Sequence, residues 1–276
     1  MSLSRFAPAP TGWLHLGHVL NAEYVWGSGA QVVLRIEDHD RERCRPEFEA
    51  GILEDLAWLG YEADVPLVRQ SERDAIYREA VGILASQGLV YGCDCTRKQI
   101  DERSSAPDPR SSSLDPRPSE LVYSGRCRDR GLALTDGVGW RVRMDPGLET
   151  FVDQVLGPQA QDPSRQCGDV LIRDRLGNWT YQFAASVDDF RQGIDLVIRG
   201  EDLLASTGRQ IRIARLLGRT VPATFLHHPL LMKSPDQKLS KSDGDTGIRD
   251  LRARGWTPTQ VKTAAHNPEW LPRRDV

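Results

Sequence analysis

The first ninety residues of the chain alternate between strand-like and helix-like hydrophobic patterns. Residues 4–8 predict a short strand that ends in a Pro/Gly turn, and the β-branched run 31–37 predicts a buried strand. Apolar residues at helical spacing predict helices over about 16–26, 46–59 and 73–87. Strand, helix, strand, helix and helix in this order predict an α/β fold with a parallel sheet.

The pattern changes between residues 93 and 180 and then returns. This stretch carries short strand-like pieces and a Pro/Ser-rich run, so we predict an inserted subdomain with a loop over 104–118. In chain order we expect strands over 140–144, 150–155 and 169–173, a helix over 181–189, a strand over 195–199, and helices over 206–218, 248–254 and 257–266.

These patterns predict how the chain is divided. Residues 1–92 and 181–244 form a discontinuous catalytic domain, and residues 93–180 form the inserted subdomain. Residues 245–276 form a short C-terminal helical segment. We find no internal repeat, so repeat architectures are not expected.

Composition narrows the class of protein. The chain has 36 basic and 39 acidic residues and a formal net charge of −3, which excludes a histone-like polycation but leaves room for a local basic groove. No apolar run reaches the roughly 20 residues of a membrane span, and the first residues lack the apolar segment of a signal peptide. We therefore expect a cytoplasmic enzyme.

A first candidate site lies where the first strand leads into the first helix, over residues 8–18. A helix N-terminus presents backbone N–H groups and positive potential to bound phosphates. Gly17 would let a nucleotide approach the backbone closely, and His15 and His18, three residues apart, can share one face and donate to phosphate oxygens. The alternative is an ordinary glycine turn with two surface histidines.

A second candidate site is the lysine-rich segment 238–242. The chain has five lysines, of which Lys233, Lys238 and Lys241 fall within nine residues. Lysines on a polar loop can neutralise the charge that develops on a polyphosphate in the transition state. The alternative is a solvated basic loop.

Together these two segments resemble class I aminoacyl-tRNA synthetases, which combine His-x-Gly-His near the N-terminus with Lys-Leu-Ser-Lys-Ser later in the chain. The closer resemblance is to glutamyl-tRNA synthetases, and it spans about residues 4–245. It is carried by residues 5–12, 35–38, 181–184, 187–189 and 197–202. The resemblance implies a Rossmann-type nucleotide-binding fold that activates glutamate with ATP and Mg²⁺.

Length distinguishes members of this superfamily. A glutamyl-tRNA synthetase continues past the lysine segment with a large helical anticodon-binding region, whereas 34 residues follow Ser242 here. We therefore expect no anticodon-binding domain. The chain resembles the shortened family that joins glutamate to the queuosine base in the anticodon of tRNA(Asp), and the partners this implies are ATP, L-glutamate and that tRNA.

The five cysteines are an odd number without a signal peptide, which argues against a disulfide framework. Cys93 and Cys95 indicate a metal, although three reduced cysteines in a small core would also explain the pattern. The resemblance implies one structural zinc ion per chain, bound by Cys-x-Cys followed by Tyr-x-x-x-Cys. These ligands are Cys93, Cys95, Tyr123 and Cys127. We expect Cys44 and Cys167 to be ordinary cysteines.

The resemblance also implies which residues bind L-glutamate. Arg5 would pair with the side-chain carboxylate and Glu37 with the α-ammonium group, and Ala7, Ala9, Tyr181 and Arg199 complete the site. Position 9 departs from the family, in which Ser is common, so any contact by Ala9 must come from its backbone. Buried ion pairs explain a further set of charged residues equally well, namely Arg35, Asp189, Glu201 and Asp202.

For ATP, the resemblance implies that His15 and His18 stabilise the transition state at the α-phosphate and that Lys241 holds the pyrophosphate end; these three are the expected catalytic residues. The expected ATP-binding residues are His15, Gly17, His18, Lys238, Leu239, Ser240, Lys241 and Ser242.

Four functions fit these features. We favour glutamate activation followed by attack of a queuosine hydroxyl on the mixed anhydride. The alternatives are a truncated glutamyl-tRNA synthetase that charges tRNA(Glu), a non-catalytic tRNA-binding paralogue, and another nucleotidyl-transfer enzyme. We expect a monomer, and arginines such as Arg126, Arg128 and Arg130 form either an RNA-binding patch or a solvated face.

Overall fold

The computed structural model describes residues 1–104, 122–234, 237–238 and 247–266. Its central layer begins with three parallel strands in the order β1 (Leu3–Phe6), β2 (Gln31–Ile36) and β3 (Val65–Arg69). Strand β9 (Leu196–Gly200) lies on the other side of β1, where Asp195 N donates to Leu3 O at 3.1 Å. The layer continues through β10 (Thr224–His228) and β6 (Glu149–Asp153), both parallel to β9, to the antiparallel edge strand β7 (Gly157–Gln161).

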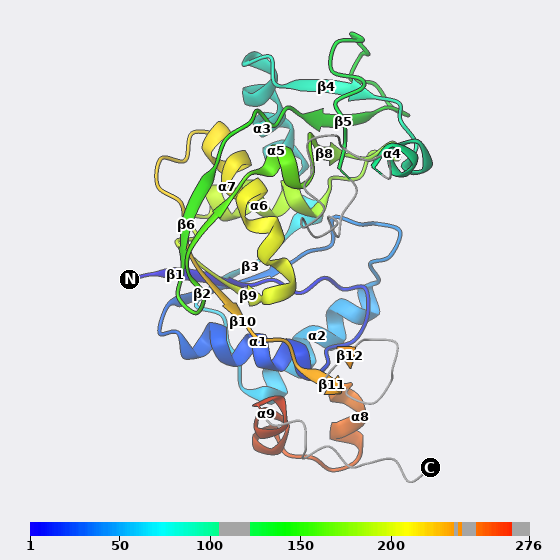
Figure 1. Cartoon of the computed structure of the whole chain (residues 1–276). Helices are drawn as coiled ribbons and strands as arrows, with labels where there is room; N and C mark the ends of the chain where they lie inside the picture. The colour runs from blue at the N-terminus through cyan, green and yellow to red at the C-terminus, as the bar shows by residue number, and fades with distance from the viewer. Residues whose placement is uncertain (105–121, 235–236, 239–246, 267–276) are drawn as a thin grey trace.

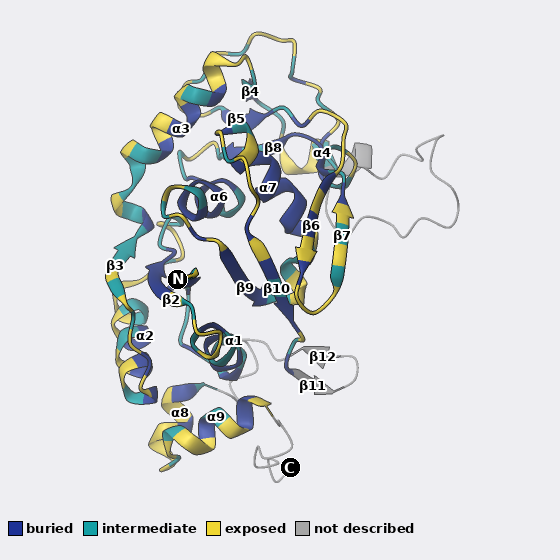
Figure 2. Cartoon of the chain, turned by 90° about the vertical axis from the view of Figure 1, so that its left-hand side faces the viewer, coloured by how far each residue is buried: buried dark blue, intermediate teal, exposed yellow. Residues whose placement is uncertain are grey.

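Helices cover both faces of this layer (Figure 1). On one face α1 (Leu16–Gly27) and α2 (Pro46–Leu59) share an apolar core with α8 (Ile248–Ala253) and α9 (Pro258–His266). On the other face lie α3 (Asp74–Ser86), α6 (Tyr181–Arg191) and α7 (Thr207–Leu216). Burial on both sides explains why β2 and β9 are almost continuously apolar, and Figure 2 shows β9 and β10 buried along most of their length.

A second sheet packs against the α3 and α6 side. It consists of the antiparallel strands β4 (Val90–Cys93), β5 (Gly139–Val142) and β8 (Val170–Arg173). Trp140 and Ile172 from this sheet share a core with Tyr77 of α3 and Phe183 of α6. The remaining elements are the short helices α4 (Arg97–Ser104) and α5 (Pro163–Gln166), the 3-10 helices η1 (Gln70–Glu72) and η2 (Glu201–Ser206), and the hairpin strands β11 (Met232–Ser234) and β12 (Gln237–Lys238).

The predicted α/β class and parallel sheet are confirmed, and every predicted helix is present within a few residues of its expected bounds. Strands β3, β4, β7, β10, β11 and β12 and the short helices α4 and α5 were not predicted. Two of them run along edges of the central layer and contain proline, and β10 ends in two histidines. The predicted strand 150–155 ends at Asp153, because Asp153 Oδ1 accepts hydrogen bonds from Val155 N and Leu156 N, both at 2.9 Å, and so caps a turn.

The bounds of the inserted subdomain stay a prediction. Strands β6 and β7 fall inside 93–180 but belong to the central layer, whereas β4, β5 and β8 form the separate sheet. The predicted loop 104–118 lies outside the described residues beyond Ser104. Among the residues that the structure describes, no helix has the length and apolarity needed to cross a membrane.

Candidate active site

The first candidate site lies at the N-terminus of α1, directly after β1. His15 is the N-cap of the helix, and its Nδ1 accepts a hydrogen bond from Gly17 N at 3.1 Å. The Nδ1 atom of His18 accepts from His15 N at 3.1 Å, and the two ring centroids are 3.9 Å apart. Because both Nδ1 atoms accept, each neutral ring carries its proton on Nε2. The two histidines therefore meet as expected and have the tautomer that can donate to a phosphate.

Gly17 is required by the packing of this turn. A Cβ atom at position 17 would lie 2.9 Å from Cε1 of His15, so any larger residue would displace the capping imidazole. Helix α1 also has no acidic residue in its first turn, which leaves its positive end unopposed by a local carboxylate. Both features suit an anion site.

The predicted glutamate-binding side chains converge at the carboxyl edge of the parallel strands, where ligands of open α/β sheets bind. Arg5 comes from β1, Glu37 follows β2, Tyr181 begins α6 and Arg199 lies near the end of β9. Burial raises the pKa of the Tyr181 phenol, and the charges of Arg199, Glu37 and Arg5 all act on it at short range. The fold thus brings two cations, one carboxylate and one phenol to a single site.

Buried carboxylates hold the first of these cations. Arg5 pairs with Asp189 at 3.2 Å and donates to Ile198 O at 3.0 Å. The fully buried Arg35 binds the same Asp189 at 2.7 Å and Glu37 at 3.0 Å. Burial favours the neutral form of Asp189, but Arg5 and Arg35 outweigh it and hold the pKa of this carboxyl below its usual value. The ion-pair explanation is therefore confirmed for Arg35 and Asp189.

Glu201 and Asp202 differ from that pair. Both residues are exposed on η2, so a buried ion pair does not explain them, and that alternative is wrong for these two positions. The Oε1 atom of Glu201 accepts from Leu230 N at 3.4 Å, which links η2 to the segment after β10.

Arg199 is held by polar groups that the sequence analysis missed. Its guanidinium donates to Gln210 Oε1 at 2.6 Å, Thr207 Oγ1 at 2.8 Å and His227 Nε2 at 3.1 Å. His227 Nδ1 in turn donates to the buried Asp153 Oδ2 at 2.6 Å. Burial lowers the pKa of Arg199, and no carboxylate in the described part of the chain forms an ion pair with it. A substrate carboxylate would supply one.

Backbone hydrogen bonds hold the turn that follows β1 and contains Ala7 and Ala9. Ala9 O accepts a hydrogen bond from Thr11 N at 2.8 Å, and Pro8 O accepts from Glu37 N at 3.0 Å. Ala7 and Ala9 are both half-buried. The second of these bonds links the turn to Glu37. The position of Glu37 therefore depends on the backbone of the turn and needs no side-chain hydroxyl at position 9.

The lysine segment is largely outside the described residues. Lys238 ends β12, whose backbone pairs with Met232, and Leu239, Ser240, Lys241 and Ser242 all lie beyond the part that the structure describes. Their predicted role in ATP binding stays a prediction.

Three cysteines form a cluster at the end of β4. The sulfur atoms of Cys93, Cys95 and Cys127 all lie within 4.8 Å of one another, with Cys95 and Cys127 at 3.6 Å. The phenol oxygen of Tyr123 lies 3.4 Å from Cys93 Sγ and accepts from Cys127 N at 3.0 Å. Three convergent thiols are the donor set that zinc prefers in structural sites. The cluster thus suits a zinc ion, and Cys44 and Cys167 are not part of it.

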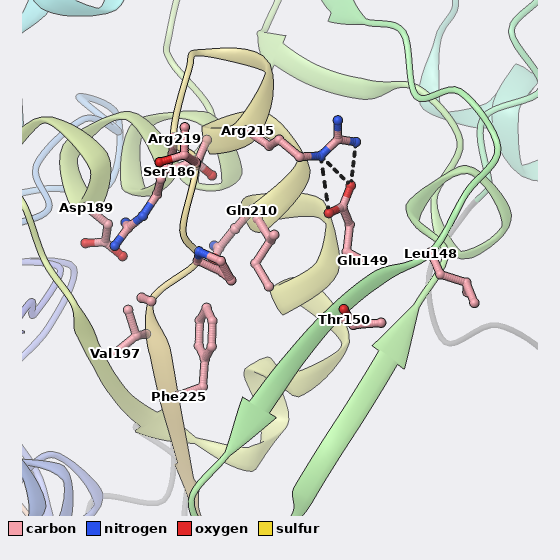
Figure 3. Close-up of a pocket in the computed structure, with 15 residues that line it drawn as sticks. Leu148, Glu149, Thr150, Ser186, Asp189, Val197, Gln210, Arg215, Arg219 and Phe225 are labelled. Carbon is pink, nitrogen blue, oxygen red and sulfur yellow. Dashed lines mark hydrogen bonds and ion pairs between the residues drawn. The ribbon is translucent and has the colours of Figure 1, made fainter.

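A cavity of about 350 Å³ lies between α6, α7 and strands β6, β9 and β10 (Figure 3). Val197 and Phe225 contribute apolar surface, and Glu149 and Arg215 form an ion pair at 2.8 Å on its wall. Asp189 and Gln210 line it, but Arg5 and Arg199 do not. The cavity therefore contacts residues that support the candidate site rather than the site itself.

Comparisons with known proteins agree with this geometry. Residues 3–266 match the family of class I tRNA synthetases (E and Q), catalytic domain. A glutamyl-Q tRNA(Asp) synthetase of Rhodobacter capsulatus is 36% identical over 277 residues, which cover 94% of this chain and 98% of the relative. A glutamyl-Q tRNA(Asp) synthetase of Bordetella bronchiseptica is 41% identical over 247 residues, with 88% and 75% covered.

A solved structure is also similar. The glutamate tRNA ligase of Elizabethkingia meningosepticum, in complex with its amino acid, superposes with a TM-score of 0.71 at 28% identity. The match covers 88% of this chain and 52% of the ligase. The chain belongs to the class I tRNA synthetase (E and Q) catalytic-domain family and, within it, to the glutamyl-Q tRNA(Asp) synthetases.

Proposed function

We propose that this chain activates L-glutamate with ATP and transfers the glutamyl group to the queuosine base of tRNA(Asp). One observation carries the proposal: Arg5, Glu37, Tyr181 and Arg199 converge at the edge of the sheet from which β1 leads to the His15–His18 turn, in a chain that aligns over 98% of a glutamyl-Q tRNA(Asp) synthetase. The match to a glutamate tRNA ligase, by contrast, extends over about half of that enzyme.

In the first step the α-carboxylate of glutamate attacks the α-phosphorus of ATP and displaces pyrophosphate. Arg5 binds the side-chain carboxylate and Glu37 the α-ammonium group, while Arg199 and Tyr181 complete the contacts. The Nε2–H groups of His15 and His18 donate to the α-phosphate as its charge grows, and Lys241 holds the leaving pyrophosphate. Mg²⁺ that accompanies ATP would supply further neutralisation of the phosphate charge.

In the second step a hydroxyl of the queuosine cyclopentene ring attacks the carbonyl carbon of the mixed anhydride. The new ester bond forms as the bond to the phosphate oxygen breaks, and AMP leaves with that oxygen. No side chain forms a covalent intermediate, so the catalytic contribution of the protein is positioning and electrostatic stabilisation.

We further propose that Cys93, Cys95 and Cys127, with Tyr123 as the fourth ligand, hold one structural zinc ion. A closed four-coordinate site leaves no position for water and therefore has a structural role. The zinc ion would link β4 to the segment that contains Tyr123 and Cys127, which begins after residue 121.

Transfer of labelled glutamate to three purified RNAs tests the proposal. With ATP and Mg²⁺, we expect label on tRNA(Asp) that carries queuosine and none on tRNA(Asp) without it or on tRNA(Glu). Label on tRNA(Glu) would instead identify a compact tRNA-charging enzyme. No label on any RNA, together with no glutamate-dependent ATP–pyrophosphate exchange, would identify a non-catalytic paralogue.

A further inference from the structure

A polar pocket of about 370 Å³ lies beside the candidate glutamate site. Its walls come from the connection between β2 and α2, from η1 and the start of α3, and from the connection between β8 and α6. None of the residues to which a role is assigned above lines it. The lining residues are His39, Arg41, Gln70, Ser71, Asp74, Arg78, Arg173, Leu176, Gly177, Asn178 and Trp179.

Two walls of this pocket continue directly into the glutamate site. His39 lies two residues after Glu37, and Trp179 lies two residues before Tyr181. Gln70 joins the pocket to the buried carboxylates, because it contacts His39 Nδ1 at 2.6 Å and donates to Asp188 Oδ2 at 2.8 Å. A ligand in the pocket would therefore sit at the edge of the glutamate site.

The charge of the pocket favours an anion. Three arginines line it against a single aspartate, Asp74, which already accepts from Arg78 at 2.6 Å and from Trp179 Nε1 at 2.9 Å. Arg41 is exposed and makes no ion pair with any carboxylate in the described part of the chain. Arg173 pairs with Asp136 at 3.5 Å, and the side chain of Asp136 is 96% exposed. In a chain of net charge −3, this concentration of cations is local.

The ATP phosphates do not account for this pocket. They are expected at the N-terminus of α1, whose core is shared with α8 and α9, whereas the pocket is formed by η1, the start of α3 and the β8–α6 connection together with the β2–α2 connection (Figure 1). An anion other than ATP therefore suits this pocket. In the proposed reaction the remaining polyanion is the RNA that accepts glutamate.

We propose that Arg41, Arg78 and Arg173 bind a backbone phosphate of the RNA next to the nucleotide that receives glutamate. This inference rests on the proposed function and adds to it a subsite that binds the RNA substrate. Phosphate contacts fix the register of a nucleic acid on a protein without reading its sequence. The pocket would hold the acceptor nucleotide in position during transfer and would take no part in glutamate activation.

The test is the double variant Arg41→Ala/Arg78→Ala, in which both changes remove exposed side chains. The matched control is Arg175→Ala/Arg191→Ala, which removes the same charge from two exposed arginines outside the pocket. Three measurements are compared: glutamate-dependent ATP–pyrophosphate exchange, the KM for queuosine-containing tRNA(Asp) in glutamate transfer, and the salt dependence of binding of the same fluorescently labelled tRNA by anisotropy.

We expect the pocket variant to retain exchange within about twofold, to raise the KM for tRNA about tenfold, and to reduce the slope of log K against log salt by about 1 to 2. The control variant should match the wild type. A pocket variant whose tRNA binding and salt slope equal those of the control would overturn the proposal, and so would loss of exchange in that variant. Failure of the proposed function is separate, because it would appear as missing exchange in the wild-type chain, in which tRNA binding can still be measured.

Discussion

Replacing Asp153 by Asn tests whether the Asp153 carboxylate positions Arg199 through His227. Asp153 Oδ2 accepts from His227 Nδ1 at 2.6 Å and from His227 N at 3.1 Å. This bond fixes the proton of His227 on Nδ1, which leaves Nε2 free of a proton so that it can accept from Arg199 Nε. If the NH₂ group of an Asn side chain took the place of Oδ2, it would face the two N–H donors of His227 and could accept a hydrogen bond from neither.

The substitution has two ways to relax, and both are costly. If the Asn amide keeps its NH₂ group toward His227, the imidazole proton must move to Nε2, where it opposes the N–H of Arg199 at 3.1 Å. If the amide turns over, its NH₂ group faces the backbone N–H groups of Val155 and Leu156 that cap the β6–β7 turn. A hydrogen bond that involves a charged group contributes about 1.5–3 kcal/mol, which corresponds to about a 10- to 100-fold change in affinity.

The assay is ATP–pyrophosphate exchange titrated with glutamate. We expect the KM for glutamate to rise about tenfold or more in Asp153→Asn, while the KM for ATP changes little, because the role proposed for Arg199 is to contact the amino acid. Asp129→Asn, at a carboxylate whose side chain is 89% exposed, serves as the control. A folded Asp153→Asn protein with an unchanged KM for glutamate would refute the reasoning that the carboxylate acts through His227 on Arg199.

Two further predictions concern the cysteine cluster and the buried carboxylate of Asp189. Cys95→Ser is expected to abolish stoichiometric zinc in metal analysis and to lower Tm, whereas Cys44→Ser keeps both, and full zinc content in Cys95→Ser would contradict the ligand assignment. Asp189→Asn is expected to cost about 3–5 kcal/mol of unfolding free energy at pH 7, because it breaks a buried pair with Arg35. The pKa of Asp189 is lowered in the folded state, so its contribution to the free energy of unfolding is present above the unfolded pKa of about 3.9 and decreases as pH falls below that value. Urea titrations at pH 7 and pH 3 measure this contribution as the difference between wild type and variant. Equal differences at the two pH values would contradict the prediction.

The helices were predictable because each buries one apolar face. The spacing of Phe48, Ile52, Leu56 and Leu59 along 46–59 and the Gly60 that follows mark α2 from first to last residue, and Gly60 has the positive φ of 77° typical of a helix end. Strand β10 gave no such signal. Its sequence Thr-Phe-Leu-His-His ends in two polar residues that are buried by partners from elsewhere in the chain.

Of the candidate site, the sequence predicted only the residues to which a substrate contact is proposed. Arg5, Glu37, Tyr181 and Arg199 belong to a recognisable family pattern, and the fold brings them together at one edge of the sheet. The groups that hold Arg199 have no local pattern, since Asp153 and His227 are 74 residues apart in sequence and each would pass as an ordinary polar residue. Support of this kind follows from tertiary packing, which no spacing of residue types encodes.

Two adjacent carboxylates on α6 connect the amino-acid site to the pocket assigned to RNA. Successive residues of an α-helix point about 100° apart, so Asp189 can face Arg5 while Asp188 faces the pocket side. Asp188 accepts from Arg73 at 2.6 Å and from Gln70 and Tyr77, both at 2.8 Å, and Gln70 forms part of the pocket wall. A shift of this helical turn would therefore change both the support of Arg5 and the shape of the pocket. The turn of α6 that holds Arg5 for its proposed contact with glutamate would then also help to set where the accepting nucleotide lies.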